Sequence, residues 1–239
     1  MEVFYLEQSA SEVPADASWL SARELVRLKE MHIPKRRAEW RLGRWTAKRA
    51  LNAYLGMVAS PETLANIELR PLPSGAPQAF VAGQFEPVKI SLSHRAGLAL
   101  CAVSPAAVAM GCDLEVVEPH SEAFVRDFFT AEEQAGIFQS SEADRLWRVS
   151  VLWSAKESAL KALGEGLRLD TRTASVYLGK EGPGNAWSPL HVECAVGETF
   201  YGWWRIAGAL ARTIVASPAP DAPEIARAIA FHRGSEVVL

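Results

Sequence analysis

The stretch Trp-Ser-Ala-Lys-Glu-Ser-Ala-Leu-Lys at residues 153–161 predicts a helix that carries charge at the edge of its buried face. Apolar side chains recur around it at helical spacing, from Leu146 to Leu163. Lys156 falls in the same register, and a lysine on a core-facing stripe is costly unless a negative group lies opposite it. A solvated helix with an ordinary Glu157–Lys161 ion pair is the structural alternative.

A second charged pattern lies upstream, in Gly-Cys-Asp-Leu-Glu at residues 111–115. Residues 108–117 are typical of a strand, and side chains two apart on a strand point to the same side. Asp113 and Glu115 therefore share one face, while Cys112 faces the core. Two acids on one face repel each other unless a cation lies between them. The alternative is a solvated polar face on an edge strand.

A basic stripe lies on the helix predicted for residues 35–55. Its members, spaced four, three and four apart, are Arg37, Arg41, Arg44 and Lys48. Glu39 is the only acid in that helix, so the stripe lacks the interleaved partners of a salt-bridged surface. Two interpretations stay open: an ordinary solvated face, or a face that meets a phosphate-bearing ligand.

The remaining pattern predicts an α+β fold. Capping boxes at residues 21–24 and 130–133 open helices that reach about residues 31 and 138, and Ser121 caps a further helix to residue 128. The predicted strands cover residues 3–6, 67–70, 88–93, 98–103, 108–117, 175–178, 191–196, 200–206 and 210–216. Each half contains helices followed by strands, without an exact repeat. We therefore expect two similar α+β lobes, residues 1–118 and 119–239, sharing one cleft.

Composition sets further bounds. The 239 residues are 49% hydrophobic with a formal net charge of −3, so nothing global indicates binding to nucleic acid. The odd number of cysteines (Cys101, Cys112 and Cys194) and their apolar neighbours predict buried thiols in a reducing compartment. No signal-peptide pattern and no membrane-spanning apolar run occurs, so we expect a cytoplasmic protein.

The acidic residues suggest a metal-assisted reaction on a phosphate compound. Asp113, Glu115 and Glu157 would bring three carboxylates to one cleft. Mg²⁺ prefers a few carboxylates, with waters and substrate phosphate oxygens completing its six positions. Lys156, Lys161 and the basic helix suit the phosphates of such a substrate. The sequence therefore predicts Mg²⁺-assisted phosphoryl transfer or pyrophosphate cleavage, and it contains no P-loop or GxGxxG pattern.

Several motifs in order resemble the 4′-phosphopantetheinyl transferases, of the larger, Sfp-like type. The elements are Ser-Leu-Ser-His at 91–94, Gly-Cys-Asp-Leu-Glu at 111–115, Phe-Phe-Thr-Ala-Glu-Glu at 128–133, Trp-Ser-Ala-Lys-Glu-Ser-Ala-Leu-Lys-Ala-Leu-Gly-Glu-Gly-Leu at 153–167, and the basic segment 35–51. The resemblance covers residues 35–170. It implies a monomeric pseudo-dimer that transfers phosphopantetheine from coenzyme A to a serine of an acyl, peptidyl or aryl carrier protein, releasing adenosine 3′,5′-bisphosphate.

The resemblance also implies roles for the charged residues. Asp113, Glu115 and Glu157 would bind Mg²⁺, or Mn²⁺, at the pyrophosphate. Either Glu157 or a metal-bound water would take the serine proton. Lys156 and Lys161 would neutralise charge on the phosphates as the bond breaks.

On the nucleotide side the resemblance is less complete. Ser93 and His94 match the family's Ser-His pair, which contacts a coenzyme A phosphate. The 3′-phosphate would meet some of Lys35, Arg36, Arg37, Arg41 and Arg44. We expect Arg44 to be the first of these. The family often has a Gly-Lys-Pro turn whose lysine reaches the nucleotide, but residues 75–77 read Gly-Ala-Pro, and Ala76 has no charge to offer.

Two other functions fit part of this pattern. A non-catalytic module could bind coenzyme A or a carrier, although it would have no need of all three acids and both lysines. A Mg²⁺-dependent nucleotide pyrophosphatase would hydrolyse coenzyme A with no protein acceptor. The carrier's pathway is not identified by the sequence.

Overall fold

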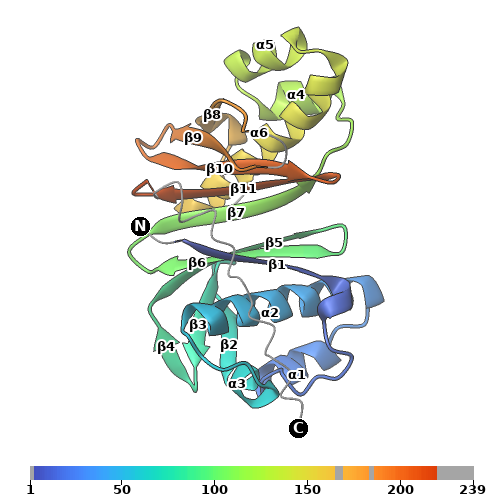
Figure 1. The fold of residues 1–239 in the computed structure, drawn as a ribbon, viewed down its shortest axis with the longest axis vertical. Helices are drawn as coiled ribbons and strands as arrows, with labels where there is room; N and C mark the ends of the chain where they lie inside the picture. The colour runs from blue at the N-terminus through green and yellow to red at the C-terminus, as the bar shows by residue number, and fades with distance from the viewer. Residues whose placement is uncertain (1–2, 165–168, 183–185, 220–239) are drawn as a thin grey trace.

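The computed structural model describes residues 3–164, 169–182 and 186–219, and it shows two α+β lobes stacked on each other (Figure 1). The first lobe and the strand that follows it contain β1 (Phe4–Ser9), α1 (Ala22–Lys29), α2 (Pro34–Tyr54), α3 (Pro61–Ala65), β2 (Ile67–Pro71), β3 (Pro77–Val81), β4 (Gln84–Glu86), β5 (Val88–Arg95), β6 (Leu98–Pro105) and β7 (Ala109–Val116). The rest comprises α4 (Glu122–Phe128), α5 (Ala131–Gln139), α6 (Glu142–Leu163), β8 (Ala174–Leu178), β9 (Ser188–Cys194), β10 (Thr199–Ala207) and β11 (Leu210–Ser217).

Within the described residues, three antiparallel sheets make up the strand layers. The first lobe holds the order β1-β6-β5, with the small sheet β2-β3-β4 beside it, and the second lobe holds β7-β11-β10-β9-β8. β7 is hydrogen-bonded to β11, so this strand belongs to the second sheet although it precedes residue 118. The α+β fold with two lobes is thus confirmed, and the division at residue 118 stays a prediction.

Helix boundaries follow the capping chemistry. Both capping boxes are present: Ser21 with Glu24 opens α1, and Thr130 with Glu133 opens α5. α6 starts at Glu142, ahead of the apolar register that begins at Leu146, because the Ser141 side chain accepts a hydrogen bond from the backbone of Asp144. Neither α3 nor the hairpin of β3 and β4 was expected from the sequence.

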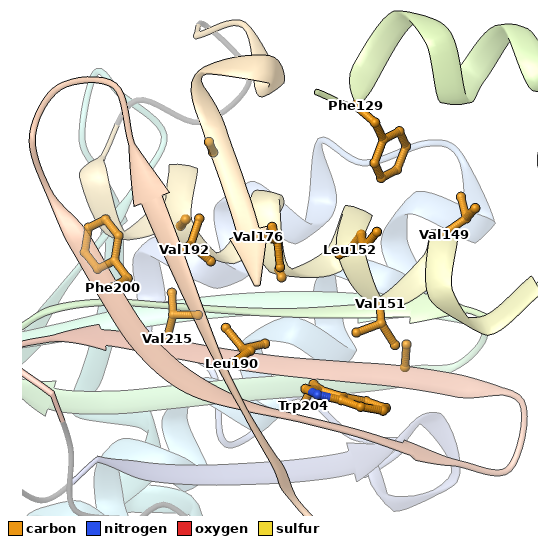
Figure 2. Packing of buried hydrophobic residues seen from close by; sticks show 14 of the residues in the cluster. Phe129, Val149, Val151, Leu152, Val176, Leu190, Val192, Phe200, Trp204 and Val215 are labelled. Atoms are coloured by element: carbon orange, nitrogen blue, oxygen red, sulfur yellow. The ribbon is translucent and has the colours of Figure 1, made fainter. Parts of the chain in front are cut away.

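Each long helix packs an apolar face on its own sheet. Figure 2 shows the core of the second lobe, where Leu152 of α6 and Val192 of β9 are among the buried side chains. A separate core lies between α2 and the first sheet, and a third apolar cluster, which includes Leu100 and Leu114, lies where the two sheets face each other. The three cysteines are buried free thiols, as predicted. None of the described helices is both long and apolar enough to cross a bilayer.

The two lobes also share an approximate repeat. Trp-Thr-Ala-Lys at 45–48 of α2 corresponds to Trp-Ser-Ala-Lys at 153–156 of α6. Both lysines have 0% exposure, and each ammonium forms an ion pair with the capping-box glutamate of its own lobe. The distances are 2.5 Å from Lys48 to Glu24 and 2.8 Å from Lys156 to Glu133. The lobes therefore resemble each other in side-chain contacts as well as in their elements.

Candidate functional site

The site is organised around Asp113, which is 2% exposed on β7. Its Oδ1 accepts hydrogen bonds from Ser93 Oγ of β5 at 2.8 Å and from Lys161 Nζ of α6 at 2.6 Å. Lys161 also donates to the carbonyl of Cys112 at 3.3 Å. Burial alone would lower the pKa of Lys161, but the Asp113 carboxylate and its neighbours raise it, so the ammonium stays charged. Residues from both lobes thus meet at one carboxylate.

Two further carboxylates lie next to Asp113. Burial raises the pKa of Glu115 and of Glu157, and the Asp113 charge raises both further. Lys161 Nζ lies 3.9 Å from Glu157, and Arg95 lies 3.4 Å from Glu115, so each acid has one weakly placed cation. The structure therefore brings together the three predicted metal ligands and one of the two predicted catalytic lysines.

This cluster fits a divalent cation that completes its coordination elsewhere. Asp113 Oδ2 is buried and has no hydrogen-bond partner among the described residues. An added cation would satisfy this oxygen and offset the repulsion that raises the neighbouring pKa values. Within the described ranges, no three acidic, histidine or cysteine side chains form a metal site by themselves. A bound ion would thus depend on waters and substrate oxygens as well as protein ligands.

A cavity of about 350 Å³ adjoins the cluster at Lys161. It is lined by Arg44, Pro71, Ser74, Gly75, Ala76, Pro77, Lys89, Ile90, Ser91, Leu92, Lys161 and Gly164. Arg44 comes from α2, Lys89 from β5 and Lys161 from α6, and no carboxylate is among these lining residues. A cavity with three cations and no acid suits an anionic ligand. Its walls come from both lobes, which is the shared cleft expected from the sequence.

Lys89 was not identified from the sequence. The signal was present in the strand alternation, which places Lys89 on the same face of β5 as Ser91 and Ser93. His94 lies on the opposite face, where a Cβ added to Gly43 of α2 would be 3.9 Å from its ring. Leu92 on that face lines the cavity, but the exposed His94 is not among its lining residues, and the predicted phosphate contact of His94 stays a prediction.

Arg37 and Arg41 do not join Arg44 at the cavity. Arg37 donates to the backbone carbonyl of Leu28 at 3.0 Å. Arg41 donates to the backbone carbonyls of Asp16, at 2.8 Å, and of Pro14. Both arginines line a different cavity, between α2 and the segment that follows β1. These hydrogen bonds hold neighbouring chain segments, so the structure does not support the predicted phosphate contacts of Arg37 and Arg41.

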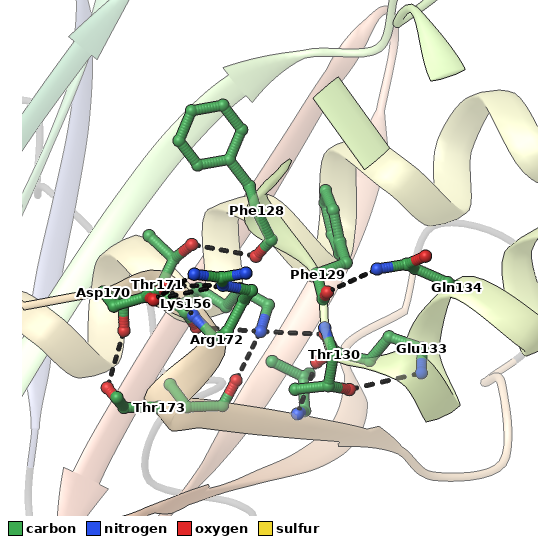
Figure 3. A network of polar contacts seen from close by, with 12 residues as sticks. Phe128, Phe129, Thr130, Glu133, Gln134, Lys156, Asp170, Thr171, Arg172 and Thr173 are labelled. Carbon is green, nitrogen blue, oxygen red and sulfur yellow. Dashed lines mark hydrogen bonds and ion pairs between the residues drawn. The ribbon is translucent and has the colours of Figure 1, made fainter. Parts of the chain in front are cut away.

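Lys156 requires a correction. Its side chain is 0% exposed and contacts residues of the second lobe, among them Thr171, which Figure 3 shows beside it. The ammonium donates to the carbonyls of Thr171 (3.0 Å) and Ala174 and pairs with Glu133 at 2.8 Å. A phosphate could reach it only if this pair opened. The predicted catalytic and coenzyme A-binding roles of Lys156 are therefore replaced by a structural one.

Part of the matched motif lies outside the described residues, namely positions 165–167 of the segment 153–167.

Phe129, next to Lys156 in Figure 3, is fully buried, whereas Phe128 is 38% exposed. Trp153 packs edge-on against Phe128 at 5.3 Å between ring centroids. These aromatic contacts hold α4 against α6 beside the site.

Comparisons with known proteins identify relatives of this chain. Residues 109–190, which include β7 and α6, match the model of the 4′-phosphopantetheinyl transferase superfamily. The chain is 30% identical to the 4′-phosphopantetheinyl transferase HetI of Nostoc sp. over 164 residues, or 68% of this chain and 67% of that protein. A solved holo-(acyl-carrier-protein) synthase from Bacillus anthracis, in complex with CoA (3′,5′-ADP), is 21% identical with a TM-score of 0.37, covering 43% of this chain and 92% of that one.

Proposed function

Because the chain belongs to the 4′-phosphopantetheinyl transferase superfamily, we propose that it moves 4′-phosphopantetheine from coenzyme A to a serine of an acyl or peptidyl carrier protein. The observation that carries this proposal is the cluster of Asp113, Glu115, Glu157 and Lys161 beside a cavity lined by cations. The carboxylates suit a metal, and the cations suit the phosphates that the metal would accompany.

Asp113, Glu115 and Glu157 would hold Mg²⁺, or Mn²⁺ in its place. When bound, the ion would supply positive charge to the pyrophosphate of coenzyme A. Lys161 would hold Asp113 in place and add charge at the leaving phosphate. Its raised pKa keeps it protonated for this task.

The transfer forms one phosphorus–oxygen bond and breaks another. The serine oxygen of the carrier attacks the phosphorus that bears pantetheine. The bond from that phosphorus to the bridging oxygen breaks, and its electron pair leaves with adenosine 3′,5′-bisphosphate. Glu157 would accept the serine proton, as one of the carboxylates that meet at this cluster.

Intact mass measurement of apo carrier proteins tests the reaction. We expect a carrier incubated with the protein, coenzyme A and Mg²⁺ to gain the mass of one phosphopantetheine, and chelation of the metal to prevent the gain. Glu115→Gln should abolish transfer while leaving the fold intact. Glu118→Gln is the matched control, because Glu118 also pairs with Arg95, at 3.1 Å, but is half-exposed outside the cluster.

The same experiment separates the other functions. Cleavage of coenzyme A without a carrier would indicate a nucleotide pyrophosphatase. Binding of coenzyme A with no modified carrier in a panel from fatty acid, polyketide and nonribosomal peptide systems would favour a binding module. We also propose that the protein acts as a monomer, because one chain supplies both walls of the cleft, and light scattering would test this. Its buried free thiols suit a reducing compartment such as the cytoplasm.

A further inference from the structure

Lys89 continues a polar row along β5 toward the second lobe. Ser91 Oγ accepts a hydrogen bond from the backbone N–H of Cys112 at 2.9 Å, and Ser93 donates to Asp113 at 2.8 Å. Side chains two apart on a strand share a face, so Lys89 projects the same way as these two serines. Unlike Ser93, it lines the cavity rather than the carboxylate cluster.

The strand spacing separates Lys89 from the residues that contact Asp113. Four residues at about 3.3 Å each separate the backbone of Lys89 from that of Ser93 by roughly 13 Å. Ser93 and Lys161 both contact Asp113, which marks the pyrophosphate end of the proposed substrate. Lys89 thus lies away from the reacting groups, in the cavity that it shares with Lys161.

The other cations of the cavity already have protein counter-ions. Lys161 pairs with Asp113 at 2.6 Å, and Arg44 lies 3.7 Å from Glu24. For the half-buried Lys89, no ion pair or hydrogen bond is found within the described part of the chain. A partly desolvated ammonium without a counter-ion is well suited to an anionic ligand.

The turn at residues 75–77 lines the same cavity but brings no charge, because its central residue is Ala76. We propose that Lys89 binds the 3′-phosphate of coenzyme A, with Arg44 beside it, and so makes the protein selective for coenzyme A over 3′-dephospho-coenzyme A. This inference rests on the proposed function for its substrate, and it assigns a residue that supplies the charge missing from the turn.

Calorimetric titration with adenosine 3′,5′-bisphosphate and adenosine 5′-monophosphate tests the assignment without requiring transfer. The two probes differ only by the 3′-phosphate. We expect the unmodified protein to prefer the bisphosphate, and Lys89→Met to reduce that preference by about 10- to 100-fold, the range for losing a hydrogen bond to a charged group. Lys89→Arg should retain most of it. Lys29→Met, at an exposed lysine of α1, is the control and should bind as the unmodified protein does.

Transfer kinetics add a second readout. Lys89→Met should raise KM for coenzyme A far more than it lowers kcat, with a smaller change for 3′-dephospho-coenzyme A. Adding Ala76→Lys to Lys89→Met should restore part of the preference, and no restoration would count against this cavity as the 3′-phosphate site. An unchanged preference in Lys89→Met, or in Lys89→Gln if the first variant does not fold, would overturn the proposal. A protein that modifies no carrier yet shows the binding preference would contradict only the proposed function.

Discussion

Replacing Lys156 by methionine separates a structural lysine from a catalytic one. Loss of one partner from a buried ion pair costs about 3–5 kcal/mol. Glu133 would keep hydrogen bonds from the backbone N–H groups of Thr130 (2.8 Å) and Val176 (2.9 Å). We therefore expect Lys156→Met to lower the free energy of unfolding by about 3 kcal/mol, at the lower end of that range. For a chain of this size, that is a fall in Tm of roughly 6–12 °C.

The assay pairs thermal unfolding with transfer measured per folded molecule, well below the Tm of the variant. Lys156→Met should retain most of its transfer activity there, because the Lys156 ammonium is bonded to Glu133, Thr171 and Ala174 inside the second lobe. Lys161→Met should instead lose transfer even per folded molecule, although its Tm should also fall because the buried Asp113 loses its counter-ion. Lys48→Met is a matched control in the first lobe, and it should destabilise the protein for the same reason as Lys156→Met.

A Lys156→Met protein with normal Tm and no transfer would refute this reasoning and restore the catalytic role. A second test is the double variant with Glu133→Gln. Because the buried carboxylate charge is removed together with the ammonium, the double variant should lose less stability than the sum of the two single changes. Additive losses would mean that the two groups do not act as a pair.

Two further predictions concern the cluster and the contact between sheet and helix. Burial and neighbouring acids raise the pKa of Glu157, so its ionised form costs stability as the pH rises above the ordinary pKa of 4.5. Glu157→Gln should therefore raise Tm near neutral pH but not below pH 4.5. The same variant should abolish transfer. Melting curves with and without Mg²⁺ should show a larger rise for the unmodified protein than for this variant. A Cβ at Gly111 would lie 1.9 Å from the carbonyl oxygen of Ser158, so Gly111→Ala should cost about 3 kcal/mol in chemical denaturation. Gly43→Ala, whose Cβ would have its tightest contact at the tip of the Leu92 side chain, at 3.0 Å, should cost clearly less.

Local patterns predicted those parts of the site that depend on local geometry. The strand period placed Asp113 and Glu115 on one face, and the helix period placed Lys156 in a buried register. Such patterns do not identify the partner of Lys156. Glu133 is 23 residues away from Lys156 in the sequence, and its place in a capping box gives it a role that requires no lysine. A spacing rule finds charges on one element, but it does not show which distant acid a buried lysine meets.

The basic stripe shows the same limit from the other side. Helical spacing put Arg37, Arg41 and Arg44 on one face of α2, but the face is long enough to meet several segments of the chain. Carbonyl groups near Asp16 occupy Arg41, and only Arg44 reaches the cavity. Lys89 was overlooked because a single lysine in a strand has no charge pattern of its own. Its significance depends on which side chains the fold places around it.

The repeat between the lobes indicates which residues of the α6 motif serve folding and which serve the proposed reaction. Lys48 and Lys156 occupy corresponding positions and both bind a capping-box glutamate inside a core. The next residue differs, since Arg49 follows the first lysine and Glu157 follows the second. A lysine with the same buried contacts in both lobes is explained by packing, whereas the acid occurs only in the lobe whose helix borders Asp113. Within the Lys-Glu pair, the lysine therefore holds the helix in place, and the glutamate is the member that faces the proposed reaction.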